Sequence, residues 1–168
     1  MEALLQEQRF RFISPDDRSF ILAFDQAMNR LGYDFGGKIG PGYCWGKYML
    51  IYTRTSVKSK NVFARIYIRE NSISLRLFLN SVDKHRAFIE QAPAHIKDVF
   101  TGSHGDCTHC HNETDGHCRF RKSYTIDGRR IDKCNGITFE FFNPDLGRLS
   151  DYLILFTEFF PEKKTRGS

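Results

Sequence analysis

Four of the five cysteines in this chain have a spacing that could hold a metal ion. Cys107 and Cys110 form a CxxC pair within residues 105–118, Cys118 closes that segment, and Cys134 follows a basic stretch. The thiolates of a CxxC pair converge on one ion, and four thiolates can complete a tetrahedron around Zn²⁺. Because a closed set of four ligands leaves no position for water, the spacing predicts a structural zinc site, with Zn²⁺ as the expected cofactor.

Three histidines beside these cysteines leave the identity of the ligands open. His109, His111 and His117 are alternates for a thiolate, and an open site that includes a histidine would be that of a zinc-dependent enzyme. An iron–sulfur cluster is a weaker alternative, because no ferredoxin-type cysteine run is present. A redox-active CxxC pair is weaker too, because such pairs open a helix, whereas this one lies in a loop rich in Gly, Asp and Asn.

Two arginines are expected to face each other on a predicted β-sheet. The runs "KYMLIYTRT", "NVFARIYIRE" and "SISLRLFLN" are rich in β-branched and aromatic residues, which predicts three consecutive strands. A two-residue turn at Glu70 and Asn71 pairs Arg65 with Arg76 and places the aliphatic side chains of both strands on the core-facing side. Like charges directly opposite each other are unfavourable, so we expect an acidic group between them, either Glu140 or a bound anion.

Aromatic side chains should surround these arginines and form a ligand-binding face. Guanidinium groups beside aromatic rings favour a planar or anionic small molecule. We therefore predict a noncatalytic, zinc-stabilised domain that binds a small ligand or a protein partner through this face. The residues expected on it are Tyr48, Tyr52, Phe63, Arg65, Tyr67, Arg76, Phe78 and Glu140, with Trp45 from the preceding glycine-rich loop.

A nucleic-acid-binding protein is the main alternative function. Bases could stack on the aromatic sheet face, and the predicted zinc hairpin is basic enough to hold phosphates. The formal net charge of +5 is modest, however, whereas a strong electrostatic footprint would show a clustered basic stripe. The basic residues of the hairpin are Arg119, Arg121, Lys122, Arg129, Arg130 and Lys133.

Known catalytic motifs are absent from the sequence. It contains no HExxH, no GxSxG, and no kinase or dinucleotide-binding fingerprint. The run "GGKIGPG" resembles a phosphate-binding loop only superficially, because it precedes a strand where a phosphate loop would precede a helix. Whether the chain is an enzyme is therefore left open by the sequence.

Other segments predict the elements that position these residues. Ser14 and Pro15 are typical of a helix start, and Gly32 ends that helix. A second helical stretch over residues 81–100 is interrupted at Pro93. Further predicted elements are a hairpin that turns at Asp127–Gly128, a strand over residues 136–142 and a final helix over residues 143–160.

This order of elements predicts an α+β fold. Consecutive strands joined by short turns favour an antiparallel sheet of about four to six strands, with helices on one face and a zinc-binding hairpin inserted over residues 104–134. We expect a single domain over residues 1–164, with residues 165–168 as a disordered tail or a cloning remnant. No apolar run is long enough to span a bilayer and the N-terminus is too charged for a secretory signal, so a cytoplasmic location without membrane contact is expected.

The three strand-like runs and the helix after them resemble small bacterial α+β proteins of the YdhG and YjbR type. The resemblance covers about half of the chain and implies the fold alone. It carries no functional residue across, and the cysteine segment departs from those families.

Overall fold

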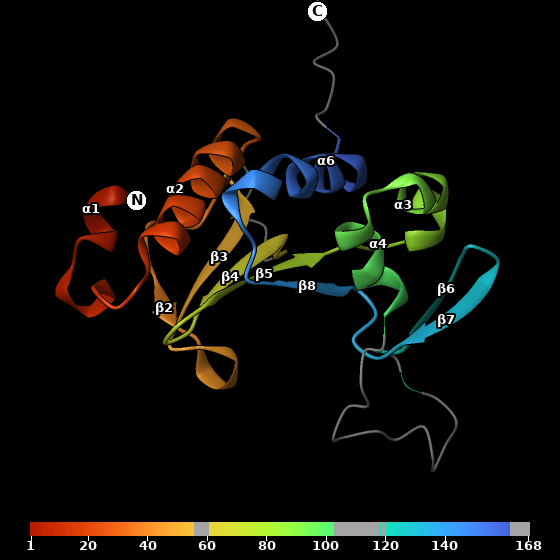
Figure 1. Cartoon of the computed structure of the whole chain (residues 1–168), viewed down its shortest axis with the longest axis horizontal. Helices are drawn as coiled ribbons and strands as arrows, with labels where there is room; N and C mark the ends of the chain where they lie inside the picture. The colour runs from red at the N-terminus through yellow and green to blue at the C-terminus, as the bar shows by residue number, and fades with distance from the viewer. Residues whose placement is uncertain (56–60, 103–117, 119, 162–168) are drawn as a thin grey trace, which may run out of the picture. The chain divides into compact units, whose positions relative to one another are not determined.

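The computed structural model describes residues 1–55, 61–102, 118 and 120–161 of the chain (Figure 1). The chain divides into two compact units. The first comprises residues 1–78 together with the C-terminal part from Glu140, and the second comprises residues 79–139. Both units contain helices and β-strands, which confirms the predicted α+β class.

An antiparallel sheet is the centre of the first unit. Its strands are β1 (Tyr33–Asp34), β2 (Gly40–Pro41), β3 (Tyr48–Arg54), β4 (Ala64–Ile68), β5 (Ile73–Phe78) and β8 (Thr138–Phe142), of which β8 contributes residues 140–142 to this unit. They lie in the order β1-β3-β4-β5-β8, and β2 also pairs with β3. These six strands match the upper end of the predicted range.

The β4–β5 hairpin has the register expected from the sequence. Arg65 pairs with Arg76, and the Arg69 N–H donates to the Ser72 carbonyl at 2.8 Å beside the turn. Because successive side chains of a strand point to opposite faces, Arg65 and Arg76 share one face, while the aliphatic residues between them point to the other. This register brings two positive charges together on the sheet.

Helices α2 and α6 lie on the aliphatic face of this sheet (Figure 1). The start of α2 is the one predicted, because the Ser14 hydroxyl accepts a hydrogen bond from the Asp17 N–H at 3.1 Å and Pro15 opens the first turn. The helical elements of the unit are α1 (Glu2–Leu5), η1 (Gln8–Phe10), α2 (Pro15–Arg30), η2 (Tyr43–Trp45), η4 (Leu146–Arg148) and α6 (Leu149–Phe159).

Aromatic side chains fill the core between the sheet and these helices. Phe24 of α2 meets Tyr52 of β3 edge-on, with ring centroids 5.3 Å apart, and Phe20 meets Tyr152 of α6 in the same way at 6.0 Å. All four rings are buried. Such aromatic pairs bury a large apolar area and fix the sheet against the helices, so the arginine pair lies on the face turned away from this core.

The second unit combines three helical segments with a β-hairpin. Pro93 caps α4 and separates it from α3, as predicted. Asp127 (φ 49°) and Gly128 (φ 72°) both have positive φ, as a type I′ turn requires, and Lys122 pairs with Lys133 at the open end of the predicted hairpin. None of the described helices in either unit is long and apolar enough to cross a membrane. The elements of this unit are η3 (Val82–His85), α3 (Arg86–Gln91), α4 (Ala94–Thr101), β6 (Lys122–Ile126) and β7 (Arg129–Lys133).

Candidate functional site

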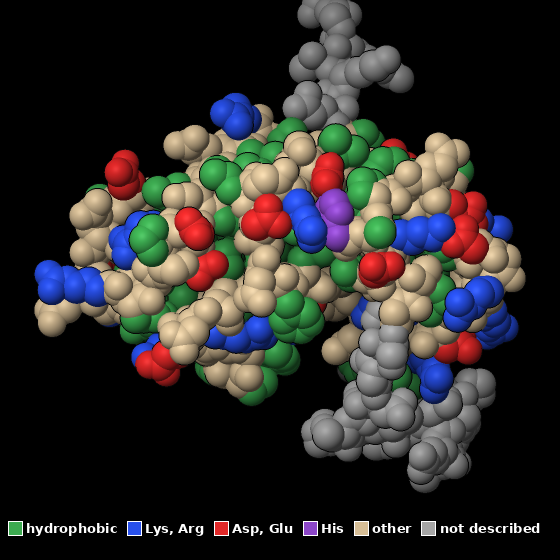
Figure 2. Space-filling view, in the orientation of Figure 1, with side chains coloured by type: hydrophobic (Ala, Val, Ile, Leu, Met, Phe, Trp, Pro, Cys, Tyr) green, Lys and Arg blue, Asp and Glu red, His purple; other side chains and the backbone are tan. Residues whose placement is uncertain are grey.

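Three arginines and one glutamate gather on the sheet face of the first unit that points away from α2 and α6. Arg65 belongs to β4, Arg69 follows that strand, Arg76 belongs to β5, and Glu140 comes from β8. Figure 2 shows Lys and Arg side chains beside hydrophobic ones on the lower side of this unit. We call these four residues, together with Trp45, Tyr67 and Ser74, the arginine face.

Glu140 is the acidic group expected from the sequence. Its carboxylate binds Arg76 at 2.7 Å and Arg69 at 3.1 Å, and it accepts a hydrogen bond from the Ser74 hydroxyl at 2.6 Å. Burial alone would raise the pKa of Glu140, but the hydrogen bonds from Ser74 and Arg76 and the two guanidinium charges hold that pKa below its ordinary value. Glu140 is therefore ionised at neutral pH.

Arg76 is a buried part of the face. Its residue is 9% exposed, and its guanidinium lies beside two neighbouring rings, 4.8 Å from the centroid of Tyr67 and 5.3 Å from that of Trp45. Nη1 donates to the Tyr67 hydroxyl at 3.3 Å, while the buried Nε finds no hydrogen-bond acceptor among the described residues. The planar guanidinium suits this position against two rings, which a lysine could not fill in the same way.

Arg65 differs from Arg76 in its partners. It donates to the Tyr67 hydroxyl at 3.1 Å and lies 5.2 Å from the ring of Phe78, both of which are uncharged. It forms no salt bridge with a carboxylate in the described part of the chain, and its Nε is buried without an acceptor. The one carboxylate of Glu140 therefore leaves two of the three guanidinium charges uncompensated.

The loop that carries Trp45 is folded tightly against the end of β4. Arg69 donates through Nε to the Trp45 carbonyl at 2.8 Å, and the Lys47 N–H donates to the Ile68 carbonyl at 2.8 Å. A Cβ at Gly46 would lie only 2.9 Å from that Ile68 carbonyl oxygen, so this approach requires glycine. The same arginine that binds Glu140 thus also holds the tryptophan in place.

Aromatic side chains near the arginines remain open to solvent. Trp45 is 41% exposed and Tyr43 in the same turn is 74% exposed, while Phe142 is 65% exposed and lies 5.4 Å from the Arg69 guanidinium. Exposed aromatic residues beside cations are suited to stacking on a planar ligand. Chemically, the face offers positive charge and flat apolar surface. Its one hydroxyl paired with a carboxylate, that of Ser74, is fully buried, and the Glu140 carboxylate that accepts from it is already bound by Arg69 and Arg76.

Two residues predicted for this face lie on the opposite one. Tyr48 pairs with Ile68 and Tyr52 pairs with Ala64, so both tyrosines point to the side covered by the helices, and the prediction that they join the ligand-binding face is wrong. Tyr52 is fully buried, and its hydroxyl donates to Asp25 at 3.3 Å. The strand "YMLIYTR" is apolar on both faces, so its pattern did not indicate which side faces the core.

The predicted ligand-binding face did not include Arg69 and Ser74, which belong to the arginine face, or Phe142, which lies beside it. Arg69 follows Arg65 and Tyr67 at intervals of two, Ser74 pairs with Tyr67, and Phe142 follows Glu140 at the same interval. The two-residue period of a strand was the signal that could have found them.

The remaining two predicted aromatic residues differ in outcome. Phe78 lies beside Arg65 as expected. Phe63 packs instead against Tyr33 and Phe160, each with ring centroids 4.9 Å away. It therefore belongs to an aromatic cluster with the C-terminal end of α6 and not to the arginine face.

The structure describes two of the four predicted zinc ligands, Cys118 and Cys134. Cys134 directly follows the last residue pair of the β6–β7 hairpin, and the Gly136 N–H donates to the Phe120 carbonyl at 2.9 Å. Both cysteines thus belong to the open end of the hairpin, and neither forms a disulfide with a described residue. The other predicted ligands and alternates, Cys107, Cys110, His109, His111 and His117, lie outside the described residues.

A cluster of three or more metal-ligating side chains is not found among residues 1–55, 61–102, 118 and 120–161. Two of the four predicted cysteine ligands, Cys107 and Cys110, lie outside these residues, so this finding does not test the full ligand set. The zinc site stays a prediction.

The basic hairpin offers fewer free charges than its sequence suggested. Lys133 is buried, and its ammonium donates to the Thr138 carbonyl at 2.6 Å and to the Cys134 carbonyl at 3.4 Å. Arg130 is bonded to Asp132 at 3.4 Å. Lys133 is therefore not available to hold a phosphate, and Arg119 lies outside the described residues.

Comparison with known proteins finds no relative of this chain. No family model, curated protein or solved structure matches the chain. The resemblance to YdhG- and YjbR-type proteins stays a prediction, and a function has to be inferred from the geometry described above.

Proposed function

We propose that this chain is a noncatalytic binding domain that takes a planar, anionic small molecule on its arginine face. The observation that carries the proposal is the surplus of two guanidinium charges beside the exposed indole of Trp45. Arg65 is half-buried, and its Nε finds no acceptor among the described residues, so a bound anion would provide a partner that this guanidinium lacks. The bound anion would thus give Arg65 a negatively charged partner, as Glu140 does for Arg76.

The proposed ligand has two parts with different partners. Its anionic group accepts hydrogen bonds from Arg65, whose partners among the described residues are the uncharged Tyr67 hydroxyl and Phe78 ring. Its planar part stacks on Trp45, whose position is fixed by the hydrogen bond from Arg69. A hydrogen bond to a charged group contributes about 1.5–3 kcal/mol and an aromatic pair about 0.5–1.5 kcal/mol, so each part adds measurably to the affinity.

The chain contains a single tryptophan, which makes this proposal directly testable. We would titrate the protein with AMP as a planar anion, adenosine as a planar neutral molecule and inorganic phosphate as a nonplanar anion. Trp45 fluorescence, excited where adenine does not absorb, reports binding at the face itself. AMP should change the emission in a saturable way and bind more tightly than either of its parts.

Variants separate specific binding from nonspecific attraction. Arg65→Gln should weaken AMP binding about tenfold, which corresponds to about 1.4 kcal/mol. Arg54→Gln is the matched control, because Arg54 is a strand arginine of the same unit that bonds to the Tyr33 hydroxyl at 3.2 Å, away from the face. Equal affinity of the two variants, or no saturable change with AMP, would overturn the proposal.

We also propose that Zn²⁺ stabilises the second unit through Cys107, Cys110, Cys118 and Cys134. The shared location of Cys118 and Cys134 at the open end of the β6–β7 hairpin supports this ligand set. Metal analysis of the purified protein should find about one zinc per chain. Cys134→Ser should lose the metal together with the folding of this unit, whereas Cys44→Ser, which removes an exposed cysteine outside the set, should retain both. A metal-free wild-type protein would contradict the proposal.

A further inference from the structure

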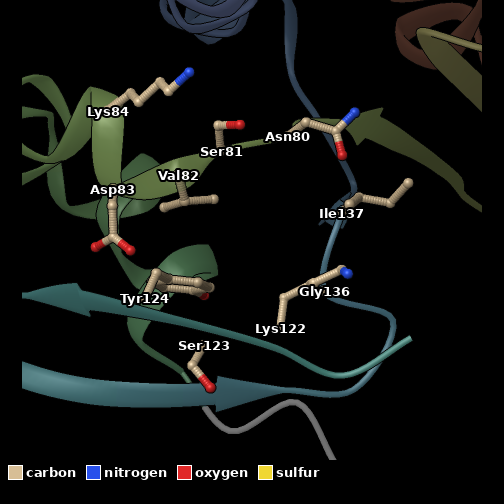
Figure 3. A pocket seen from close by; sticks show the side chains of 10 residues that line it. All are labelled: Asn80, Ser81, Val82, Asp83, Lys84, Lys122, Ser123, Tyr124, Gly136 and Ile137. Atoms are coloured by element: carbon tan, nitrogen blue, oxygen red, sulfur yellow. The ribbon is translucent and has the colours of Figure 1, made fainter. Parts of the chain in front are cut away.

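The second unit contains a cavity of about 410 Å³ that the proposed function does not use (Figure 3). Ligand sites in proteins commonly have volumes of about 300–1,000 Å³, so this cavity can hold a small molecule. Its wall comes from the start of η3, from β6 and from the segment after β7. The lining residues are Asn80, Ser81, Val82, Asp83, Lys84, Lys122, Ser123, Tyr124, Gly136 and Ile137.

Backbone hydrogen bonds hold the wall of this cavity in shape. The Leu79 N–H donates to the Ile137 carbonyl at 2.7 Å, and the Lys84 N–H donates to the Ser81 carbonyl at 2.9 Å. Ser81 itself has a φ of 59°, an uncommon conformation for a residue with a side chain. The cavity is therefore built by defined contacts of its own wall.

The wall on the η3 side is also tied to β6. The Thr125 N–H donates to the Asp83 carboxylate at 2.9 Å, and Arg86 binds the same carboxylate at 2.8 Å. Asp83 is thus held by two partners, of which Arg86 is its counter-ion and stands outside the cavity lining. This ion pair lowers the repulsion between Asp83 and an anion in the cavity.

Apolar side chains line the inner part of the cavity. Val82 and Tyr124 are both buried, and Figure 3 shows them next to each other between η3 and β6. The Tyr124 hydroxyl donates to the Phe100 carbonyl at 2.6 Å, so its polar atom is already satisfied. A ligand therefore meets the aromatic ring and the valine methyl groups here, which favours an apolar body.

Two lysines supply positive charge from opposite walls. Lys84 comes from η3 and Lys122 from β6, and neither ammonium forms a hydrogen bond or ion pair with any residue in the described part of the chain. Asn80 and Ser81 add uncharged polar groups beside them (Figure 3). Because Lys84 and Lys122 outnumber Asp83 among the lining residues, the net charge around the cavity is positive.

We propose that this cavity binds a small organic anion, in which a carboxylate or phosphate group faces Lys84 and Lys122 and an apolar body lies against Val82 and Tyr124. The site is separate from the arginine face and uses different residues. Tight binding requires both the anionic group and the apolar body of the ligand. The lysines that bind the anionic group are exposed to water, and the apolar surface that binds the body lies deeper in the cavity. Inorganic phosphate alone, or a neutral ring alone, would satisfy only one of these contacts.

Backbone amide NMR would locate binding residue by residue, which suits a cavity whose natural ligand is unidentified. We would titrate the full chain with phenyl phosphate and benzoate, which carry the two anionic groups on the same ring. Benzyl alcohol tests the neutral ring, and inorganic phosphate tests the anion. One of the two ring-bearing anions should shift the amides of Ser81, Ser123 and Gly136 in a saturable way, and the benzyl alcohol and phosphate probes should bind at least about tenfold more weakly.

Charge-removing variants test the role of the lysines. The double variant Lys84→Gln/Lys122→Gln should weaken binding about tenfold or more, since it removes both charged donors. The Cβ and Cγ atoms of Lys122 pack so closely against Gly136 that a Cβ at position 136 would overlap them. Glutamine at position 122 keeps these two atoms and therefore preserves the contact. Lys84→Gln alone leaves this contact intact and should show a smaller loss of affinity. Arg129→Gln at the exposed hairpin tip is the matched control and should bind like wild type.

Several outcomes would overturn this site. They are the absence of saturable shifts at Ser81, Ser123 and Gly136 with either ring-bearing anion, unchanged affinity in the double variant, and inorganic phosphate binding as tightly as the ring-bearing anion that shifts these amides. Trp45 fluorescence in the same samples reports the arginine face, so a ligand that occupies only that face is recognised as such. The proposals for the cavity and for the arginine face are therefore tested independently of each other.

Discussion

Arg65 and Arg76 face each other across β4 and β5, but among the residues that the structure describes a carboxylate pairs with Arg76 alone. Glu140 reaches Arg76 from β8 and binds Arg69 as well, so the neighbouring strand neutralises one member of the pair and leaves the other. Arg65 is oriented by the Tyr67 hydroxyl, a neutral partner that does not cancel its charge. The anion that we propose for this face would therefore bind Arg65, whereas Arg76 stabilises the fold through Glu140.

Replacing Glu140 should destabilise the first unit. Glu140→Gln removes the only carboxylate that binds Arg76 and Arg69 in the described structure and leaves a buried guanidinium unpaired. Breaking a buried ion pair on one side costs about 3 kcal/mol or more, and chemical denaturation followed by Trp45 fluorescence should detect this loss in the free energy of unfolding.

The control for this prediction is an exposed glutamate. Glu70 pairs with Lys47 at 3.4 Å, and both side chains are largely open to solvent. Glu70→Gln should therefore change the free energy of unfolding by less than about 1 kcal/mol. Comparable losses in the two variants would show that Glu140 does not carry the role assigned to it.

The pairing of Glu140 also predicts a pH dependence. A carboxyl whose pKa is lower in the folded than in the unfolded state stabilises the fold above its unfolded-state pKa, and this contribution is lost as the pH falls through the folded-state pKa. Wild type should therefore lose stability in acid more steeply than Glu140→Gln. Parallel stability profiles of the two proteins between neutral pH and acid would contradict this.

Arg76 should not be replaceable by lysine. Its guanidinium contacts the rings of Trp45 and Tyr67 and binds Glu140 at the same time, which a lysine ammonium cannot reproduce. Arg76→Lys should lower the free energy of unfolding by about 1–3 kcal/mol and shift Trp45 emission to the red. Arg9→Lys is the control, because Arg9 also stacks on an aromatic ring but is largely exposed. An unchanged emission spectrum in Arg76→Lys would contradict the contact between Arg76 and the Trp45 ring.

The faces of β4 and β5 could be predicted because polar and aliphatic residues alternate along both strands. Arg65, Ile66 and Tyr67 point alternately to the two sides, and the facing strand agrees with this pattern. In β3 the residues at both faces are apolar or aromatic, so the sequence did not distinguish the two sides, and Tyr48 and Tyr52 were assigned to the wrong one.

Contacts between distant segments were harder to predict than local elements. Glu140 could be suggested as a partner because cross-strand charges pair, but its shared contact with Arg69 and Ser74 depends on where β8 joins the sheet. The position of Trp45 depends in the same way on the Arg69 hydrogen bond to its carbonyl. Sequence periodicity reports the side of a strand and carries no information about which strand lies next to it.

The Trp45 loop should depend on glycine at position 46. A Cβ there would lie 2.9 Å from the Ile68 carbonyl oxygen, so Gly46→Ala forces the loop away from β4. We expect AMP affinity to fall about tenfold, because Trp45 moves relative to Arg65. Gly40→Ala is the control, since a Cβ at that position has no neighbour within 4 Å. Normal AMP binding by Gly46→Ala would show that the loop position is not needed for recognition.

Asp25 should reduce stability at neutral pH through its buried charge. Its residue is 7% exposed, and burial raises the pKa of this carboxyl above its ordinary value despite the hydrogen bond from Tyr52. The ionised form is therefore disfavoured in the folded state, and this cost disappears as the pH falls through the raised pKa and then through the ordinary value of 3.8. Asp25→Asn removes the charge and should raise the free energy of unfolding at neutral pH, with the gain shrinking in acid. Asp16→Asn, at the exposed start of the same helix, should instead lower stability slightly, because it removes a negative charge from the helix N-terminus. Denaturant titrations across this pH range measure both effects, and a destabilised Asp25→Asn at neutral pH would mean that the hydrogen bond to Tyr52 outweighs the cost of the buried charge.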